Sequence, residues 1–263
     1  MTGERTLRVL AAQLRASVMT AMQYRANFLV SGLVALYWVA WNFLPLLILF
    51  GDRQMVAGWD YPSALVVVGY FVILRAVLEG IITPSFEDAI SRIRNGSFDY
   101  VLLKPLDAML LVSACKVEPW KALELLAGLG IFVHAFLELG RPPTPGAVAL
   151  GVVMLLSGVV AMYSLWLAAV SLSFWAVRLD NLMYLLSAIF DVGRWPISVF
   201  RGAVRVVFTV VIPVAIMTTF PAMALLGRGD ARTATGAIGG SALMLLGSRL
   251  LWRRAIAAYT SAS

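Results

Sequence analysis

The sequence predicts an all-α, polytopic membrane protein with six transmembrane helices. Hydrophobic residues make up 61% of the 263 positions and charged residues only 13%, and the mean hydropathy is +0.87. A soluble domain could not bury this much apolar surface. Apolar runs of about 20 residues, the length that crosses a bilayer, recur along the chain and are separated by charged or turn-forming segments. We therefore expect one transmembrane domain over residues 1–263.

The expected elements follow the chain in order. Residues 1–26 form a basic amphipathic helix, with Leu7, Leu10 and Leu14 on one stripe, that lies in the membrane interface as an elbow. The alternative is that this helix only extends the first span. The predicted spans are residues 27–50, 61–82, 119–139, 147–175 and 234–251, with one further crossing before the last of them. Residues 83–118 form a polar region between the second and third spans.

The longest polar stretch begins with signals for a separate short helix. Thr83 is a suitable N-cap and Pro84 a suitable first residue, while Glu87 and Asp88 lie near the positive end of the helix dipole. Apolar residues fall at i, i+3, i+4 and i+7, and charged residues occupy the other side. The apolar set is Phe86, Ala89, Ile90 and Ile93, and the basic residues of the last turn are Arg92 and Arg94.

Asn95 and Gly96 supply the left-handed residue that ends such a helix, and Lys104 with Pro105 predicts a second helix up to Val117. The first helix should therefore lie along the membrane surface and join two spans.

Charged residues inside the spans are few. Arg75 and Glu79 are four residues apart on one face of the second span, so we expect them to form an ion pair. Such a pair is either part of a transport path or a structural contact with the surface helices, and its place near one end favours the second reading. Glu124 and the lone His134 lie in or near the third span, and a single histidine there is more often a helix contact than a ligand.

Two apolar stretches, 182–200 and 204–226, precede the last span, and parity allows only one of them to cross. Pro213 and Pro221 favour a re-entrant path for the second stretch. Counting basic residues places both termini and region 83–118 on the cytoplasmic side. Arg194, Arg201 and Arg205 lie in the ambiguous region of residues 182–226. The count of basic residues alone would place them on the cytoplasmic side. Residue patterns leave the choice between the two stretches open.

Several functions are excluded by what the sequence lacks. Cys115 is the only cysteine, so no internal disulfide or cysteine metal cluster can form. We find no phosphate-binding GxxxxGK[ST] loop, no HExxH and no nucleophile elbow, so we expect no catalytic residue, no metal and no cofactor held by this chain. The net charge of +7 is spread beside apolar spans, which indicates membrane topology and no nucleic-acid partner.

Two short motifs carry a resemblance to a known family. The first is Arg25-Ala26-Asn27-Phe28 at the start of the first span, and the second is Gly-x-x-Asp-x-x-Leu-x-x-Pro-Leu after the second span. The second motif is formed by Gly96, Asp99, Leu102, Pro105 and Leu106. With the order of spans, these motifs resemble the membrane (permease) subunit of bacterial type-2 ABC exporters, in the branch with this cytoplasmic loop.

The resemblance implies a half-transporter of the bacterial cytoplasmic (inner) membrane with both termini in the cytoplasm. Its implied partners are the lipid bilayer, a second identical or homologous permease, and two ATPase subunits that bind the ATP. It implies that residues 181–200 are the fifth span and residues 201–226 a re-entrant segment before the last span. It also implies that the helix after the second span is a coupling helix that docks on an ATPase. The residues that would carry this role are Phe86, Glu87, Asp88, Ile90, Arg92, Arg94, Gly96, Asp99 and Pro105.

Two other functions stay open from the sequence. An ATP-independent secondary transporter would use buried charges as coupling sites, and a membrane scaffold protein would show no transport.

Overall fold

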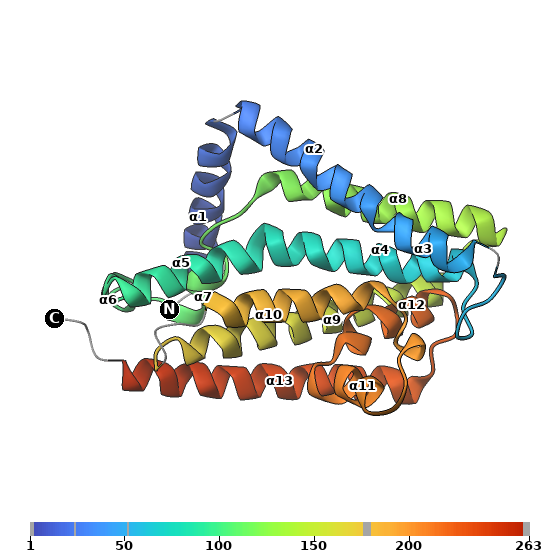
Figure 1. The fold of residues 1–263 in the computed structure, drawn as a ribbon. Coiled ribbons are helices and arrows are strands. Elements are labelled where there is room, and N and C mark those ends of the chain that lie inside the picture. The colour runs from blue at the N-terminus through green and yellow to red at the C-terminus, as the bar shows by residue number, and fades with distance from the viewer. Residues whose placement is uncertain (1–2, 24, 52, 176–179, 260–263) are drawn as a thin grey trace.

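A computed structural model describes residues 3–23, 25–51, 53–175 and 180–259, and within these ranges the chain is all-helical (Figure 1). The one β-bridge there, between Val56 and Trp59, is isolated. The helices are α1 (Gly3–Gln23), α2 (Arg25–Trp41), α3 (Phe43–Phe50), α4 (Tyr61–Val77), η1 (Leu78–Ile82), α5 (Thr83–Arg94), α6 (Asp99–Leu102), α7 (Ala108–Ser113), η2 (Pro119–Lys121), α8 (Ala122–Leu139), α9 (Pro145–Leu172), α10 (Asp180–Phe190), η3 (Asp191–Arg194), η4 (Ile197–Val199), α11 (Gly202–Val206), η5 (Val207–Val211), η6 (Ala215–Thr219), α12 (Phe220–Leu225) and α13 (Ala231–Ala258). The predicted all-α class is confirmed.

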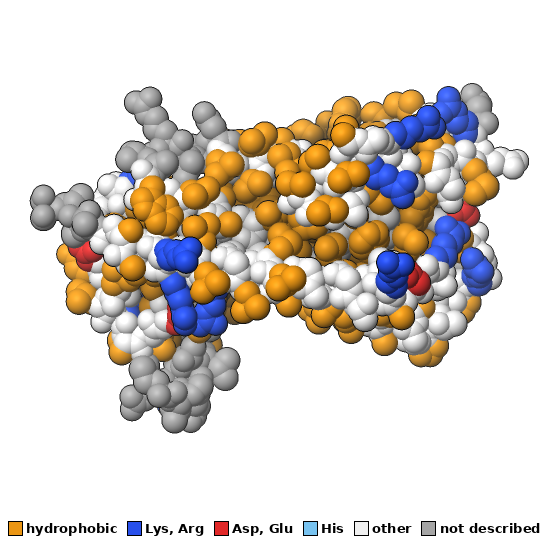
Figure 2. Space-filling view, turned by 90° about the horizontal axis from the view of Figure 1, so that it is seen from below, with side chains coloured by type: hydrophobic (Ala, Val, Ile, Leu, Met, Phe, Trp, Pro, Cys, Tyr) orange, Lys and Arg blue, Asp and Glu red, His pale blue; other side chains and the backbone are white. Residues whose placement is uncertain are grey.

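The long helices lie side by side and define two ends of the molecule (Figure 1). The termini end holds α5, α6, α7 and the last turn of α13, and the loop end holds residues 53–60, 140–144 and 227–230. Figure 2 shows charged side chains toward both ends of one face, while its middle is mainly apolar. This distribution is typical of helices that cross a bilayer, because charges there are costly in the hydrocarbon core.

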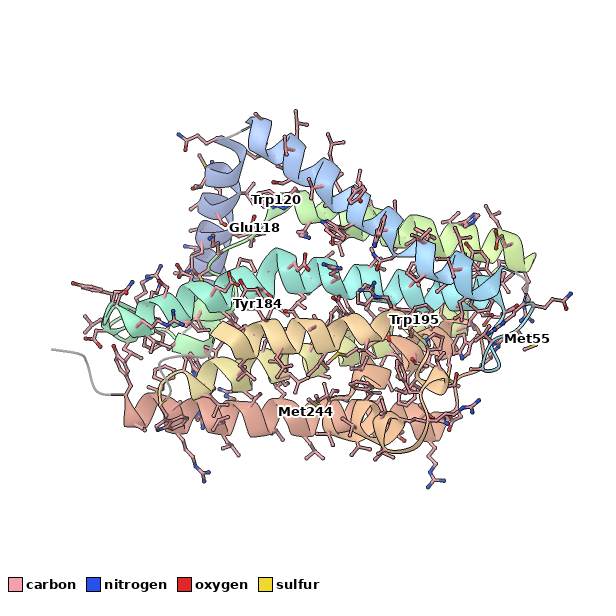
Figure 3. The ribbon with its side chains drawn as sticks, viewed as in Figure 1. Met55, Glu118, Trp120, Tyr184, Trp195 and Met244 are labelled. Atoms are coloured by element: carbon pink, nitrogen blue, oxygen red, sulfur yellow. The ribbon has the colours of Figure 1, made fainter. Side chains whose placement is uncertain are left out.

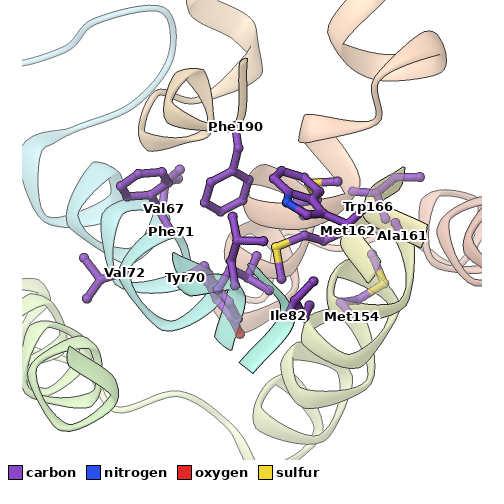
Figure 4. Close-up of a cluster of buried hydrophobic side chains, with 14 of the residues drawn as sticks. Val67, Tyr70, Phe71, Val72, Ile82, Met154, Ala161, Met162, Trp166 and Phe190 are labelled. Carbon is purple, nitrogen blue, oxygen red and sulfur yellow. The ribbon is translucent and has the colours of Figure 1, made fainter. Parts of the chain in front are cut away.

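Five helical segments are long and apolar enough to span: Phe28–Phe50, Tyr61–Arg94, Pro119–Leu139, Pro145–Leu172 and Ala231–Ala258. The second is the centre of the fold, since 78% of its apolar window is buried inside the protein, against 17% to 39% for the other four. Its side chains form the core with α9 and α10 (Figure 4), where the rings of Phe71 and Phe190 stack at 5.2 Å and Trp166 packs against Phe190.

The structure corrects the predicted helix start at Thr83. Tyr61–Arg94 is one helical segment of 34 residues, and Thr83 has helical angles (φ −59°, ψ −53°) instead of those of an N-cap. A proline inside a helix cannot donate to the carbonyl four residues earlier. That carbonyl belongs to Gly80, and it accepts instead from the Glu118 N–H at 2.8 Å, at the π-helical turn η1. The second span therefore continues through the proline into α5, and α5 is not a separate surface helix.

The predicted second helix from Pro105 to Val117 is also shorter than expected. Only Ala108–Ser113 is helical, and Asp107 caps it by accepting from the Met109 N–H at 2.9 Å. The helix α1 runs steeply across the direction of the spans, as an interfacial helix would (Figure 1). Its Ser17 hydroxyl accepts from the Val117 N–H at 2.8 Å. Of the predicted α1 stripe, the Leu7 and Leu10 side chains lie outside the described residues.

The helix at the predicted fifth span, residues 181–200, is shorter than expected. It consists of α10 with η3 and ends at Arg194, and it is not one of the five segments that are long enough to span. Ser198 then lies at the loop end, where it accepts from the Trp59 indole N–H and donates to the Ala57 carbonyl, both at 3.0 Å. The next segment, Gly202–Val211 with Ala215–Leu225, is bent by 72° and lies at the same end (Figure 1). A bend of this size fits either a broken span or a re-entrant loop. Arg201, just before this segment, is exposed.

Candidate functional site

The apolar face of α5 packs inside the protein. Phe86 and Ile90 are buried, and the Phe86 ring lies 5.6 Å from that of Tyr163 on α9. The Tyr163 hydroxyl also hydrogen-bonds to that of Ser113 at 2.6 Å. Phe86 and Ile90, which the resemblance includes in the coupling role, therefore fix α5 against the fourth span and α7.

The polar face of α5 is only partly free for contacts. Asp88 and Arg92 form an ion pair at 2.5 Å within the helix, and both are half-buried. Glu87 and Arg94 are exposed. The Cys115 sulfur lies 3.6 Å from an Asp88 oxygen, and burial, followed by this nearby carboxylate, raises the pKa of the thiol to about 11. Of the four predicted docking charges, two therefore belong mainly to the protein's own packing.

The turn after α5 is anchored by an aromatic cluster. Gly96 has φ +69°, which favours glycine and lets the chain reverse. Phe98 is then fully buried, with its ring 5.4 Å from Phe174, 6.1 Å from Trp252 and 5.8 Å from Tyr259. Phe98 therefore ties the polar loop to the ends of the fourth and sixth spans. It was missed from the sequence, because Phe98 is not one of the motif positions that carry the resemblance.

A chain of charges joins the second and third spans. The predicted pair Arg75 and Glu79 is present, with 2.8 Å between Nε and Oε1. The other Glu79 oxygen accepts from Lys121 at 2.5 Å, and the same ammonium lies 2.6 Å from Glu124. Glu124 is buried, with 3% of its side chain exposed. Within the described residues, Lys121 is the only basic residue that forms an ion pair with Glu124, and it links the two helices.

The same chain of charges also reaches η3, in the predicted fifth span. Arg75 lies 3.7 Å from Asp191, which in turn lies 3.4 Å from Arg194. The Arg194 guanidinium also lies over the Phe71 ring at 5.4 Å. Three acids and three bases balance in this cluster, which lowers the cost of holding charge inside the membrane region. We call these six residues the charge network: Arg75, Glu79, Lys121, Glu124, Asp191 and Arg194. The charge network connects the second and third spans with η3.

The sequence profile of the ABC-2 family transporter proteins matches residues 36–263 of this chain, a stretch that contains α5 to α7 and the whole charge network. The chain belongs to the ABC-2 transporter family. It has no match among curated proteins and none among solved structures. As an ABC-2 family protein it is a multi-pass membrane permease, the transport component of an ABC transporter.

Other sequence candidates in this ABC-2 permease stay apart from the charge network. His134 lies 3.2 Å from Glu138 on the exposed side of α8, as a helix contact. Within the described residues, no group of three or more His, Cys, Asp or Glu could hold a metal ion. A groove of about 480 Å³ lies between α1 and residues 115–120, and Figure 3 shows Glu118 and Trp120 at this junction. Burial there raises the pKa of the Glu118 carboxyl.

Proposed function

We propose that this permease is half of the membrane pathway of an ATP-driven exporter in the bacterial cytoplasmic membrane, with its termini end in the cytoplasm. Two copies, or this chain and a homologous permease, would form the path, and two separate ATPase subunits would dock at the termini end. The observation that carries the proposal is the 34-residue segment Tyr61–Arg94. At about 1.5 Å per residue it is about 51 Å long, whereas the hydrocarbon core measures about 30 Å.

The length matters because the surplus lies at one end. Trp59 and Tyr61 suit the membrane interface at the loop end. Counting about 30 Å from Tyr61, the helix leaves the hydrocarbon near Ile81, so most of α5 extends into the headgroups and water. A movement of α5 there would be carried into the membrane by the same helix.

The contacts around η1 support a transmission route. Gly80 and Glu118 are joined by a backbone hydrogen bond, and Glu79 is joined to Lys121. Displacement of α5 would therefore shift the start of the third span, and through Arg75 and Asp191 it would reach the fifth crossing. ATP binding and closure of the partner subunits would supply the energy, since no phosphate-binding loop occurs in this sequence.

Purification from native membranes tests the proposal without knowledge of the substrate. A tagged chain, extracted in mild detergent, should carry a P-loop ATPase subunit and vanadate-sensitive ATP hydrolysis, and native mass spectrometry should show two ATPases per two permeases. Isolation of the chain alone, or with partners that lack a P-loop, would refute the proposal.

A secondary transporter is the second candidate, because the charge network places six ionisable groups among three spans. These groups already neutralise one another, which favours a structural part for them. Transport in vesicles that persists after ATP depletion, and stops when the ion gradient is collapsed, would favour this candidate over the exporter.

A further inference from the structure

A polar groove lies between α1 and the segment that leads into α8. Its volume is about 480 Å³, within the range of about 300 to 1,000 Å³ that is typical of small-ligand sites. We call it the α1 groove. One wall is a stripe of α1 at helical spacing, formed by Gln13, Ala16, Ser17 and Thr20. The other wall is formed by Arg92, residues 115–118 and Trp120.

Hydrogen bonds hold the walls of the α1 groove in place. The Ser17 hydroxyl accepts from the Val117 N–H at 2.8 Å and donates to the Val117 carbonyl at 3.2 Å. From α5, the Ser85 hydroxyl accepts from the Lys116 N–H at 3.1 Å and donates to the Lys116 carbonyl at 2.8 Å. Residues 116 and 117 are therefore fixed to two helices. A preformed groove loses little conformational entropy when a ligand binds.

The α1 groove lies at the level of the lipid headgroups. Counted from Tyr61, the second span leaves the hydrocarbon after about 30 Å, near Ile81. The Glu118 N–H donates to the carbonyl of Gly80, so Glu118 lies at this same depth. Figure 3 shows Glu118 and Trp120 between α1 and the start of α8, and tryptophan is enriched at this boundary of the membrane. The ligands present at this depth are lipid headgroups.

Two acceptors on the walls lack a hydrogen-bond donor. Glu118 is half-buried, and its Oε2 receives no hydrogen bond from any described residue. Gln13 donates through Nε2 to the Leu111 carbonyl at 3.4 Å, while its Oε1 also has no donor among the described residues. A buried acceptor without a donor is costly. The last torsion of a glutamate side chain is soft, so the Glu118 carboxylate can turn toward a donor in the groove.

Positive charge lies close to this carboxylate. Lys116 lines the groove only two residues from Glu118 and is exposed. Arg92 also lines the groove, but it is paired with Asp88 within α5, so of these two cations Lys116 is the one available to an anion. A ligand that complements the walls therefore carries an ammonium for Glu118 and a phosphate for Lys116.

We propose that the α1 groove binds one phospholipid with a phosphoethanolamine headgroup, from the leaflet at the termini end. The ammonium donates its N–H groups to the Glu118 carboxylate and to Oε1 of Gln13, and Lys116 holds the phosphate. The bound lipid joins α1 to the start of the third span. This inference goes beyond the proposed function and does not depend on an ATPase partner.

Native mass spectrometry of the full-length permease, purified with whatever partners it retains, tests the inference with three lipids of identical acyl chains. Phosphatidylethanolamine should occupy one tight site per chain. Phosphatidylcholine carries the same charges but no N–H donor, so it should bind about tenfold more weakly. Phosphatidylglycerol lacks the ammonium and should also bind about tenfold more weakly. Equal binding of the ethanolamine and choline lipids, or tighter binding of phosphatidylglycerol, overturns the inference.

Two variants assign the headgroup contacts. Glu118→Gln should bind the ethanolamine and choline lipids equally, without a lower melting temperature in lipid-free detergent, because the backbone bond to Gly80 remains. Lys116→Gln should weaken both lipids about tenfold and keep their order, since both carry the phosphate. Glu138→Gln is the matched control: this acid lies at the other end of α8 with 37% of its side chain exposed, and the variant should keep the wild-type preference. A Glu118→Gln variant that still prefers the ethanolamine lipid overturns the inference.

Glycerophosphoethanolamine, the same headgroup without acyl chains, distinguishes a lipid from a soluble ligand. It should not displace the bound lipid at equal concentration, because it lacks the chains that remain in the hydrocarbon. Displacement would overturn the assignment to a lipid. Neither result bears on the ATPase partner, so the proposed function is tested separately by the purification.

Discussion

Replacing Lys121 with methionine should destabilise the permease far more than replacing its buried partner. Methionine keeps the unbranched shape of lysine but removes the charge. The Glu124 carboxylate, 3% exposed, then loses the ammonium at 2.6 Å and remains buried without a counter-charge. Removing one partner of a buried ion pair costs about 3 to 5 kcal/mol. At about 2 to 4 °C per kcal/mol for a chain of this size, the melting temperature should fall by about 6 to 20 °C.

Glu124→Gln should cost only about 1 to 2 kcal/mol, because Lys121 keeps Glu79 at 2.5 Å and the amide can still accept a hydrogen bond. The double variant Lys121→Met/Glu124→Gln should therefore be more stable than Lys121→Met alone, since no buried charge is left unpaired at position 124. Thermal unfolding of the three variants in nanodiscs, followed by tryptophan fluorescence, measures the cycle. Equal losses in the two single variants, or no recovery in the double variant, would refute the proposed pairing.

Three further predictions follow from single sites. Gly80→Ala should lower the free energy of unfolding by about 1 to 2 kcal/mol, because the new Cβ would lie 3.1 Å from the Cβ of Lys121. Gly247→Ala is the control, since its Cβ would meet no atom within 4 Å, and thermal unfolding should show it to be neutral or stabilising. Alkylation of Cys115 by N-ethylmaleimide should accelerate about tenfold per pH unit between pH 7 and 9.5, since the pKa of its thiol is raised to about 11 and little thiolate exists below it; a rate that levels off near pH 9 would contradict this. Phe98→Ala should lower unfolding free energy by about 3 to 5 kcal/mol through loss of the aromatic cluster, and an unchanged melting curve would show that Phe98 is not an anchor.

Hydropathy and length locate long apolar helices because both are local properties. The helix expected at residues 119–139 lies at Pro119–Leu139 in the structure. The helix expected at residues 181–200 is less accurate, since it gives way to η3 at Asp191. That charged break is held by Arg75, a residue more than a hundred positions away, and no local pattern reveals such a pairing.

The start of α5 shows why local signals can mislead. Thr83 and Pro84 are favourable at the beginning of a helix, but the same residues occur inside a longer one when the lost hydrogen bond is replaced. Glu118 makes that replacement, and it is distant in sequence. For the site, the pattern found Arg75 with Glu79 and the helix end at Gly96, but it placed α5 along the membrane surface and did not reveal that its apolar face packs inside the protein. Burial by Tyr163 depends on tertiary packing that one sequence does not display.

The position of the π-helical turn matters for the proposed coupling. A straight α-helix through Pro84 would leave the Gly80 carbonyl without a partner, whereas the observed turn gives that carbonyl to Glu118. The same turn carries Glu79, which contacts Lys121. The backbone and the side chain of one helical turn thus bind the start of the third span in two ways. On the proposed function, force applied at α5 would reach the third span at this turn, and Lys121→Met would weaken transport by removing one of these two contacts.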